Sequence, residues 1–237
     1  MKTVAETYIA GRPASGTNGQ GHGISMGLWL SIVMVAATLL VGCRQGKPTH
    51  SLLPDSLRLQ VGDVVFRRCT GLTSRIVVMS DSEGIFSHTG IVADSAGRLM
   101  VVHAVPGETE RNDEPDRVKM EPVDEFFSSR QAVAAGVARP RDARAGRIAA
   151  AYAVRRFREG TLFDHDFNDS DTTRLYCTQL VTLAYGHAGV RLVDSVPEII
   201  DLPTFHYRCV LPSQVQQSPQ LRMLFVVDTS KKIHRKR

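Results

Sequence analysis

The chain has 237 residues and a formal net charge of +5, and its hydrophobic and charged fractions, 43% and 22%, are close to those of average globular proteins. This composition excludes a largely disordered chain, and no repeat or low-complexity tract indicates a solenoid, collagen-like or prion-like protein.

Five basic residues near the C-terminal end carry a charge equal to the whole net charge, namely Lys231, Lys232, Arg235, Lys236 and Arg237. We therefore interpret residues 229–237 as a basic tail, either solvated or attracted to anionic envelope polymers, and predict no nucleic-acid partner.

The N-terminal part has the features of an export signal. Residues 27–41 form an uncharged apolar run that is shorter than the about 20 residues of a membrane-spanning helix and typical of a signal-peptide core. Gly42 and Cys43 follow the run, and this arrangement resembles a bacterial lipobox, in which the cysteine becomes the lipidated N-terminus. We therefore predict a lipoprotein signal peptide over residues 1–42 and lipidation of Cys43.

Lipidation of Cys43 predicts a protein anchored in the cell envelope. Several acyl chains supply more than the two signals that stable membrane anchoring needs. Arg44, which follows the cysteine, resembles the pattern sorted to the outer membrane in Gram-negative bacteria, so we expect the domain in the periplasm. Two alternatives remain open: an uncleaved anchor, and a start at Met26 that leaves no basic residue ahead of the apolar run.

Three further cysteines, Cys69, Cys177 and Cys209, follow the signal. In an oxidising compartment one pair would leave a single free thiol, and a lone thiol in an exported enzyme is a candidate nucleophile. Cys69 and Cys209 are a candidate disulfide pair. The sequence does not supply the Cα separation that a disulfide requires, so their pairing stays open.

Residues 43–56 are interpreted as a tether, and residues 57–228 as one domain. Apolar runs bounded by turn residues predict strands at 64–66, 88–93, 99–105, 118–123 and 132–139. Helical patterns predict helices at 72–80, 143–159 and 176–188. Because the strands precede the main helices instead of alternating with them, we expect an α+β fold with an antiparallel sheet.

Cys177 is the strongest candidate for catalysis. The polar stretch 168–173 ends where the apolar helical pattern begins, which places Cys177 at or near a helix N-terminus. The helix dipole and the free backbone N–H groups at such a position favour a thiolate and can hold an oxyanion during acyl transfer. The alternative is a buried structural cysteine, since cysteine is among the most buried residue types.

Two histidines are candidates for the base that serves this thiol. His88 stands at the start of a predicted strand, where it acts either as a general base or as a structural histidine. His103 lies on the next predicted strand, and the midpoint between the two falls inside the predicted turn at 94–97. We therefore expect the histidines nearly opposite each other across a hairpin, with His103 orienting His88.

Other polar signals are weaker. Tyr176, next to Cys177, is a candidate for a wall of the substrate groove or for a core position. Asp164, His165 and Asp166 are typical of a solvated loop, and their spacing does not match a zinc site. No glycine-rich phosphate loop is present, and we predict neither a metal nor a cofactor.

Five motifs occur in an order that resembles a known family, the permuted papain-like hydrolases of the YiiX/YebB-like branch within the NlpC-type cysteine hydrolase superfamily. They are GDVVF at 62–66, FSHTGIV at 86–92, VHA at 102–104, FDHDF at 163–167 and YCTQLV at 176–181. The resemblance covers residues 61–227. It implies a circularly permuted papain-like fold of the α+β class, with an antiparallel sheet or small barrel packed on helices.

The resemblance also implies site residues: Cys177 as nucleophile, His88 as base and His103 as the orienting third residue. This branch often has glutamate at the third position, whereas histidine is found in the related lecithin–retinol acyltransferase-like group. Gln179 stands where the helix motif more often has an acid, a change that we do not expect to abolish catalysis. The departures leave open whether the chemistry is amide hydrolysis or lipid acyl transfer.

We therefore expect an exported, lipid-anchored cysteine hydrolase that cleaves an amide bond through an acyl-enzyme, with peptidoglycan stem peptides as candidate substrates. One alternative is a lipid acyl ester or thioester hydrolase, or an acyltransferase, that uses the same triad. The other is a non-catalytic binding module of the envelope. A pocket lined by long aliphatic side chains would favour the lipid substrate.

Overall fold

The computed structural model describes residues 49–108, 113–194, 198–202 and 205–230, all of which belong to one compact unit, Pro48–Arg237. The predicted signal peptide, the lipidation site Cys43 and residues 231–237 of the basic tail lie outside the described residues. Within the described ranges, no helix combines the length and the apolar composition needed to cross a membrane.

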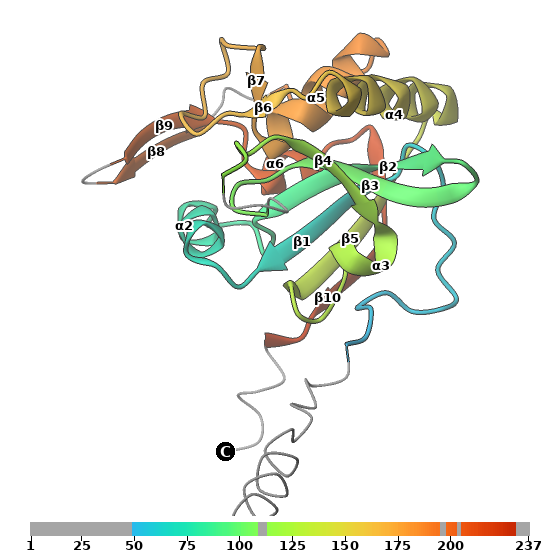
Figure 1. The fold of residues 1–237 in the computed structure, drawn as a ribbon. Coiled ribbons are helices and arrows are strands. Elements are labelled where there is room, and N and C mark those ends of the chain that lie inside the picture. The colour runs from blue at the N-terminus through green and yellow to red at the C-terminus, as the bar shows by residue number, and fades with distance from the viewer. Residues whose placement is uncertain (1–48, 109–112, 195–197, 203–204, 231–237) are drawn as a thin grey trace, which may run out of the picture. The chain divides into compact units, whose positions relative to one another are not determined.

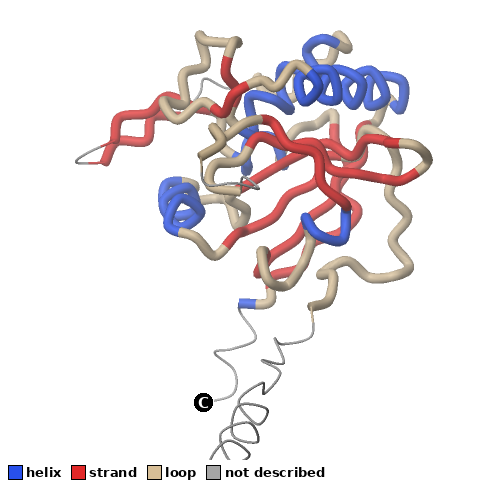
Figure 2. The backbone as a smooth tube through the Cα atoms, in the orientation of Figure 1, coloured by secondary structure: helices blue, strands red, loops and turns tan. Residues whose placement is uncertain are grey.

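A six-stranded antiparallel sheet forms the centre of the fold (Figures 1 and 2). Its strand order is β10-β5-β1-β2-β3-β4. The strands are β1 (Val64–Cys69), β2 (His88–Ser95), β3 (Arg98–Ala104), β4 (Val118–Pro122), β5 (Ala132–Pro140) and β10 (Leu221–Asp228). Every pair of neighbours is antiparallel, which confirms the predicted α+β class.

Two helices cover one face of this sheet, α4 (Ala143–Arg158) and α5 (Cys177–His187), as Figure 1 shows. The buried positions of α4 are alanines and a glycine, which allow the helix backbone to approach the sheet closely. Asp142 caps α4, because its side chain accepts hydrogen bonds from the N–H groups of Arg144 and Ala145. Phe66, Ile91 and Tyr185 belong to the core between the sheet and these helices.

The opposite face of the sheet carries a second, smaller core. The short helix α3 (Val123–Phe126) lies over it, and Phe126 and Phe127 are fully buried there. The segment interpreted as a tether already contacts this core, since the Leu52 N–H donates to the carbonyl of Phe127 at 2.9 Å and Leu53 packs nearby. The two cores together bury the central strands on both faces of the sheet.

The hairpin of β2 and β3 turns one residue later than the sequence predicts. Ser95 pairs with Arg98, and the two residues between them, Ala96 and Gly97, have φ values of 54° and 81°. Two successive left-handed residues make the turn type that suits the twist of a hairpin. The later turn shifts the pairing, so His103 lies across from Gly90 and diagonal to His88, not opposite it.

The helix α2 (Leu72–Ser80) has the predicted bounds. Several small elements were not predicted: the parallel pair β6 (Leu162–Phe163) and β7 (Arg174–Leu175), the hairpin of β8 (Glu198–Leu202) and β9 (Phe205–Cys209), and the helix α6 (Pro212–Gln216). The edge strand β10 and the helix α3 were missed as well. Most of these elements are short, and short elements give little periodic signal in a sequence.

Candidate active site

Cys177 is the first residue of α5, and Tyr176 before it is an extended N-cap residue with φ of −96° and ψ of 172°. The predicted position at a helix N-terminus is therefore confirmed. Gln179 holds the loop that precedes the helix, because its side-chain amide donates to the carbonyls of Asn168 at 3.3 Å and Asp171 at 2.9 Å. Gln179, which stands where the helix motif more often has an acid, thus stabilises the loop that leads to the nucleophile.

Burial raises the pKa of the Cys177 thiol to about 11, although the backbone N–H groups of Thr89, Thr178 and Cys177 itself lower it. The helix N-terminus alone was expected to favour a thiolate, but here the loss of solvation outweighs it. The resting site therefore holds a protonated thiol. The same three N–H groups are donors of the kind that stabilise a developing oxyanion.

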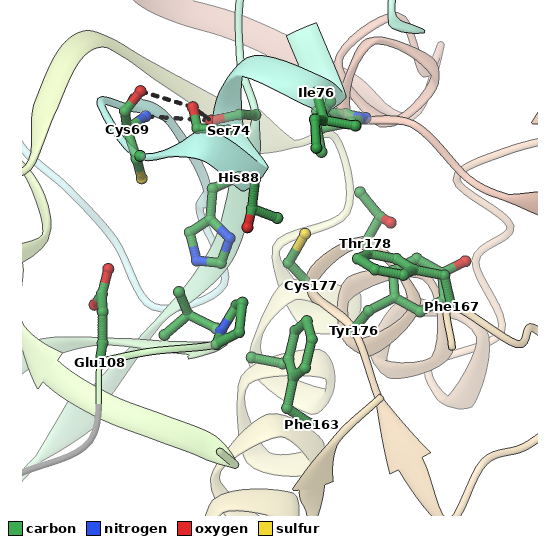
Figure 3. A pocket seen from close by; sticks show the side chains of 18 of the residues that line it. Cys69, Ser74, Ile76, His88, Glu108, Phe163, Phe167, Tyr176, Cys177 and Thr178 are labelled. Carbon is green, nitrogen blue, oxygen red and sulfur yellow. Dashed lines mark hydrogen bonds between the residues drawn. The ribbon is translucent and has the colours of Figure 1, made fainter. Parts of the chain in front are cut away.

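His88 and His103 form a direct pair. His88 Nε2 lies 2.8 Å from His103 Nδ1, and both rings contact Phe126 beneath them. His88 is the first residue of β2, and the next residue, Thr89, brings its N–H to the Cys177 thiol. Figure 3 shows the His88 ring and the Cys177 thiol turned toward each other in one pocket. The structure thus brings together all three residues that the sequence singled out.

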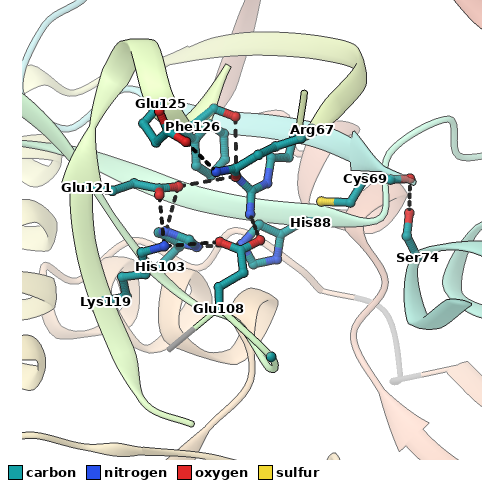
Figure 4. Close-up of polar contacts among 12 residues, drawn as sticks. Arg67, Cys69, Ser74, His88, His103, Glu108, Lys119, Glu121, Glu125 and Phe126 are labelled. Carbon is teal, nitrogen blue, oxygen red and sulfur yellow. Dashed lines mark hydrogen bonds and ion pairs between the residues drawn. The ribbon is translucent and has the colours of Figure 1, made fainter. Parts of the chain in front are cut away.

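A close ion-pair contact links His103 to Glu121 on β4, a residue that the sequence did not single out. Its Oε1 lies 3.0 Å from His103 Nε2 and 3.2 Å from Arg67 Nη1, and its Oε2 lies 3.0 Å from Lys119 Nζ (Figure 4). Glu121 and Lys119 are two residues apart on β4, so both side chains lie on the same side of the sheet as His103. The sequence offers one signal for Glu121, namely that an acidic residue stands inside a predicted strand.

The charge of the Glu121 carboxylate favours one arrangement of hydrogens on the two imidazoles. With this negative charge 3.0 Å from His103 Nε2, the tautomer with the hydrogen on Nε2 is favoured, and His103 Nδ1 is then the acceptor. His88 Nε2 must then donate to that acceptor. The remaining nitrogen of His88, Nδ1, keeps its lone pair and is available to take the proton of Cys177.

Arg67 places a fully buried positive charge beside the histidine pair. Its guanidinium pairs with Glu108 at 2.5 Å as well as with Glu121, and it stacks over Phe126 at 4.6 Å from the ring centroid. Burial, reinforced by the charge of Arg67, lowers the pKa of His88 well below its usual value, and His103 is shifted in the same direction for the same reasons. Both imidazoles are therefore neutral at pH 7.

Within the described residues, His103, Glu108 and Glu121 form a group whose ligand atoms lie within 4.8 Å of one another, close enough for a metal ion. Arg67 and Lys119 already pair with both carboxylates, so a cation at this place would be repelled. This donor set therefore does not fit a metal.

The side chains of the acidic loop after β6 contact nearby residues. Asp164 accepts hydrogen bonds from the backbone N–H groups of Asp166 and Asn168, and His165 pairs with Asp116 at 3.2 Å. These side chains serve separate contacts and do not converge on one site.

A pocket of about 840 Å³ opens over Cys177 and His88. Tyr176 contributes a wall to it, but its hydroxyl is bonded to Asp169 and accepts the N–H of Val210 at 3.2 Å. Cys69 and Cys209 line the same pocket, and the disulfide that the sequence left open does not join them.

A family model described as permuted papain-like amidase enzyme, YaeF/YiiX, C92 family, matches residues 58–225. Among solved structures, a crystal structure described as that of the metalloprotein yiiX from Escherichia coli O157:H7 superposes with a TM-score of 0.57 at 20% sequence identity, covering 71% of this chain and 98% of that chain. At this identity the likeness concerns the fold alone. No curated protein matches the chain.

Proposed function

The chain belongs to the permuted papain-like amidases of the YaeF/YiiX, C92 family and is a cysteine hydrolase of the amidase type; on this premise we propose that Cys177, His88 and His103 form its catalytic triad. The observation that carries the proposal is that Cys177 and His88 face one pocket, where His88 Nε2 lies 2.8 Å from His103 Nδ1 and His103 Nε2 lies 3.0 Å from the carboxylate of Glu121. In this arrangement Glu121 is a positioning residue, because it acts through His103.

The proposed reaction begins from a neutral pair. As Cys177 Sγ attacks the carbonyl carbon of an amide, its proton moves to His88 Nδ1. The backbone N–H groups around the thiol hold the oxyanion of the tetrahedral intermediate. His88 then gives the proton to the leaving amine, and water attacks the thioester, which releases the carboxylic acid and restores the thiol. Arg67 and Lys119 balance the negative charge of the Glu121 carboxylate beside the histidine pair.

The cellular setting is also part of the proposal. The apolar run at 27–41 and the lipobox-like Cys43 support an exported lipoprotein, anchored in a bacterial membrane with its domain in the envelope. The amides of peptidoglycan stem peptides are then within reach of the enzyme and are a candidate substrate class.

The triad is tested by turnover of a panel of coumarinyl amides with peptidyl and acyl groups. We expect Cys177→Ala to abolish turnover and His88→Ala to lower kcat by about 10²- to 10⁴-fold, the usual contribution of a general base. Cys69→Ser is the matched control, because Cys69 lines the same pocket as a free thiol outside the proposed triad. Full activity of Cys177→Ala would refute the mechanism.

The anchor is tested separately by metabolic labelling with a radioactive fatty acid and by fractionation. We expect the natural chain to incorporate the label and to sediment with membranes, and the Cys43→Ser variant to lose the label. Labelling of the Cys43→Ser variant at the natural level would contradict the predicted lipidation site.

A further inference from the structure

Arg67 is fully buried, although its guanidinium carries a permanent charge. Its Nη1 donates to the carbonyl of Phe126 at 3.3 Å and to Gln131 Oε1 at 2.5 Å. Its ion pairs are with the carboxylates of Glu108 and Glu121. Taking a charge out of water is costly unless such partners compensate it. Because the partners come from β4, from α3 and from two loops, the fold holds this charge at a defined point.

That point lies directly opposite His88. Arg67 on β1 and His88 on β2 are partners in the strand register, and facing residues of neighbouring antiparallel strands have Cβ atoms about 5 Å apart. Arg67, His88 and His103 all pack on the ring of Phe126. Figure 4 shows the three side chains gathered in one cluster. A fixed positive charge therefore stands next to both histidines.

The charges around the histidine pair balance while both imidazoles are neutral. Arg67 and Lys119 are the two cations, and they pair with two carboxylates, Glu108 and Glu121. A proton on either imidazole would add an uncompensated positive charge beside the buried guanidinium, where little solvent screens it. The titratable and charged groups packed around the pair are Arg67 and Cys69 from β1, Lys119 and Glu121 from β4, Glu108 from the loop after β3, and Cys177 from α5.

We propose that Arg67 is a positioning residue of the reaction: it holds Glu121 in place against His103, and its charge opposes protonation of His88, so that the base stays available in acidic surroundings. This inference rests on the proposed function, because it assigns a role in the same reaction. It agrees with the pKa of His88, which burial and the charge of Arg67 lower. Only unprotonated His88 can take the proton of Cys177. Activity is therefore lost when the pH falls through this lowered pKa, below the ordinary value of about 6.5.

Carbethoxylation by diethyl pyrocarbonate reports the protonation state of His88 without turnover, because only the neutral imidazole attacks the reagent. His88 is the single histidine of the tryptic peptide 76–98, so mass spectrometry of this peptide measures its modification. The experiment uses the full-length chain in lipid nanodiscs over a pH series. We expect the labelling rate, corrected for hydrolysis of the reagent, to stay level well below about pH 6.5, and the urea-unfolded chain to titrate near that value.

Arg67→Met removes the charge and keeps much of the side-chain volume. We expect the midpoint of His88 labelling to move to higher pH by about one to three units, and the acid limb of kcat/KM to move with it. Arg67→Lys keeps the charge but loses the fork that reaches two carboxylates. Its midpoint should stay near that of the natural chain, while kcat falls at every pH because Glu121 is less firmly held.

Arg68→Met is the matched control. Arg68 is the next residue of β1, so its side chain lies on the opposite face of the sheet, where it pairs with Asp228 at 2.7 Å. This substitution removes the same charge from the same strand and should leave the His88 midpoint and the acid limb unchanged. An unmoved midpoint in Arg67→Met, shown to be folded by circular dichroism, would overturn the proposal. So would equal shifts in Arg67→Met and Arg68→Met.

If Arg67→Met does not fold, the combined variant Arg67→Met/Glu121→Gln, which removes one charge of each sign, is compared with Glu121→Gln. A higher midpoint in the combined variant would support the effect of the Arg67 charge, and equal midpoints would refute it.

The labelling also separates this inference from the proposed function. A midpoint that moves in Arg67→Met, without hydrolysis of any amide by the natural chain, would support the placed charge of Arg67 and refute the amidase reaction. Turnover by the natural chain, with an acid limb that Arg67→Met does not move, would refute the role of Arg67 and leave the triad in place.

Discussion

At the scale of single residues, the site is built from neutral partners. Burial raises the pKa of Cys177 to about 11 and lowers the pKa of His88, so neither group is charged at pH 7. A preformed thiolate–imidazolium pair is therefore not the resting state, and the proton moves only as the thiol attacks. In the proposed triad, the charge of Glu121 favours the tautomers that leave His88 Nδ1 as the free base.

The raised thiol pKa predicts the pH dependence of alkylation. We expect the rate of Cys177 alkylation by iodoacetamide to rise by about tenfold per pH unit between pH 7 and 10, because only the thiolate reacts. The measurement is peptide mass spectrometry over a pH series, with the urea-unfolded chain as control, in which the midpoint should fall near the ordinary value of about 8.5. A plateau below pH 8.5 in the folded protein would contradict a protonated resting thiol.

Glu121→Gln should lower kcat while leaving KM nearly unchanged. Glutamine can donate as well as accept, so it no longer enforces the reactive tautomer of His88. We expect a loss smaller than the about 10⁴-fold that follows removal of the orienting carboxylate in a serine-protease triad, since Glu121 stands one residue further away. Loss of its negative charge should also lower the pKa of His88 further and move the acid limb of the kcat profile to lower pH.

The control for this substitution is Glu125→Gln, since Glu125 is an exposed glutamate of the neighbouring helix α3. Its pH profile should match that of the natural enzyme. An unchanged acid limb in Glu121→Gln, together with a lowered melting temperature, would assign Glu121 a structural role only.

At the scale of elements, the hairpin of β2 and β3 positions the histidine pair. His103 lies across from Gly90, where no side chain stands between it and His88. A Cβ atom at Gly90 would meet Val101 Cγ1 at 2.8 Å, the carbonyl oxygen of Val102 at 2.9 Å and His103 Cβ at 3.0 Å. The glycine therefore lets the two strands approach and lets the diagonal histidines reach hydrogen-bonding distance.

Gly90→Ala should consequently harm both stability and activity. The backbone of β3 must move, which we expect to lower the free energy of unfolding by about 1–3 kcal/mol, as overpacked cores do. The shift also displaces His103 from His88, so kcat should fall with it. Urea unfolding and turnover measure the two effects. Gly71→Ala is the control, because nothing lies within 4 Å of a Cβ atom at that position; an equal effect there would contradict the steric argument.

At the scale of the whole molecule, the sheet is stabilised by a core on each face, and the active site uses both. Cys177 comes from the helices on one face, whereas His88, His103 and Arg67 lie on the side of Phe126. The second core is small and is completed by residues ahead of the first strand, including Leu52 and Leu53. These residues therefore contribute to the layer that supports the histidines.

The double substitution of Leu52 and Leu53 by alanine should lower the free energy of unfolding by about 1–3 kcal/mol, because both leucines are half-buried against the second core. Urea unfolding with an unchanged m-value is the expected signature. Leu72→Ala, at a leucine that is 74% exposed, is the control and should change stability by less than about 0.5 kcal/mol. Equal effects of the two would show that residues 52–53 do not support the domain.

Several features follow from local patterns in the sequence alone. The bounds of α2, the presence of β1 to β5, and the position of Cys177 at a helix N-terminus were predicted from apolar periodicity and turn residues. Such patterns report local structure because a side chain's burial repeats with the period of its own element. The order of the motifs was also sufficient to indicate the family and hence the class of hydrolase.

Only the tertiary structure decided the register of the hairpin, the protonation state of the thiol and the part played by Glu121. A shift of the turn by one residue made the histidines diagonal, and the burial of Cys177 reversed the pKa change expected from the helix N-terminus. These properties depend on which groups from distant strands exclude water and bring charges together. Desolvation and pairing arise from packing between elements, so no local pattern in the sequence could specify them.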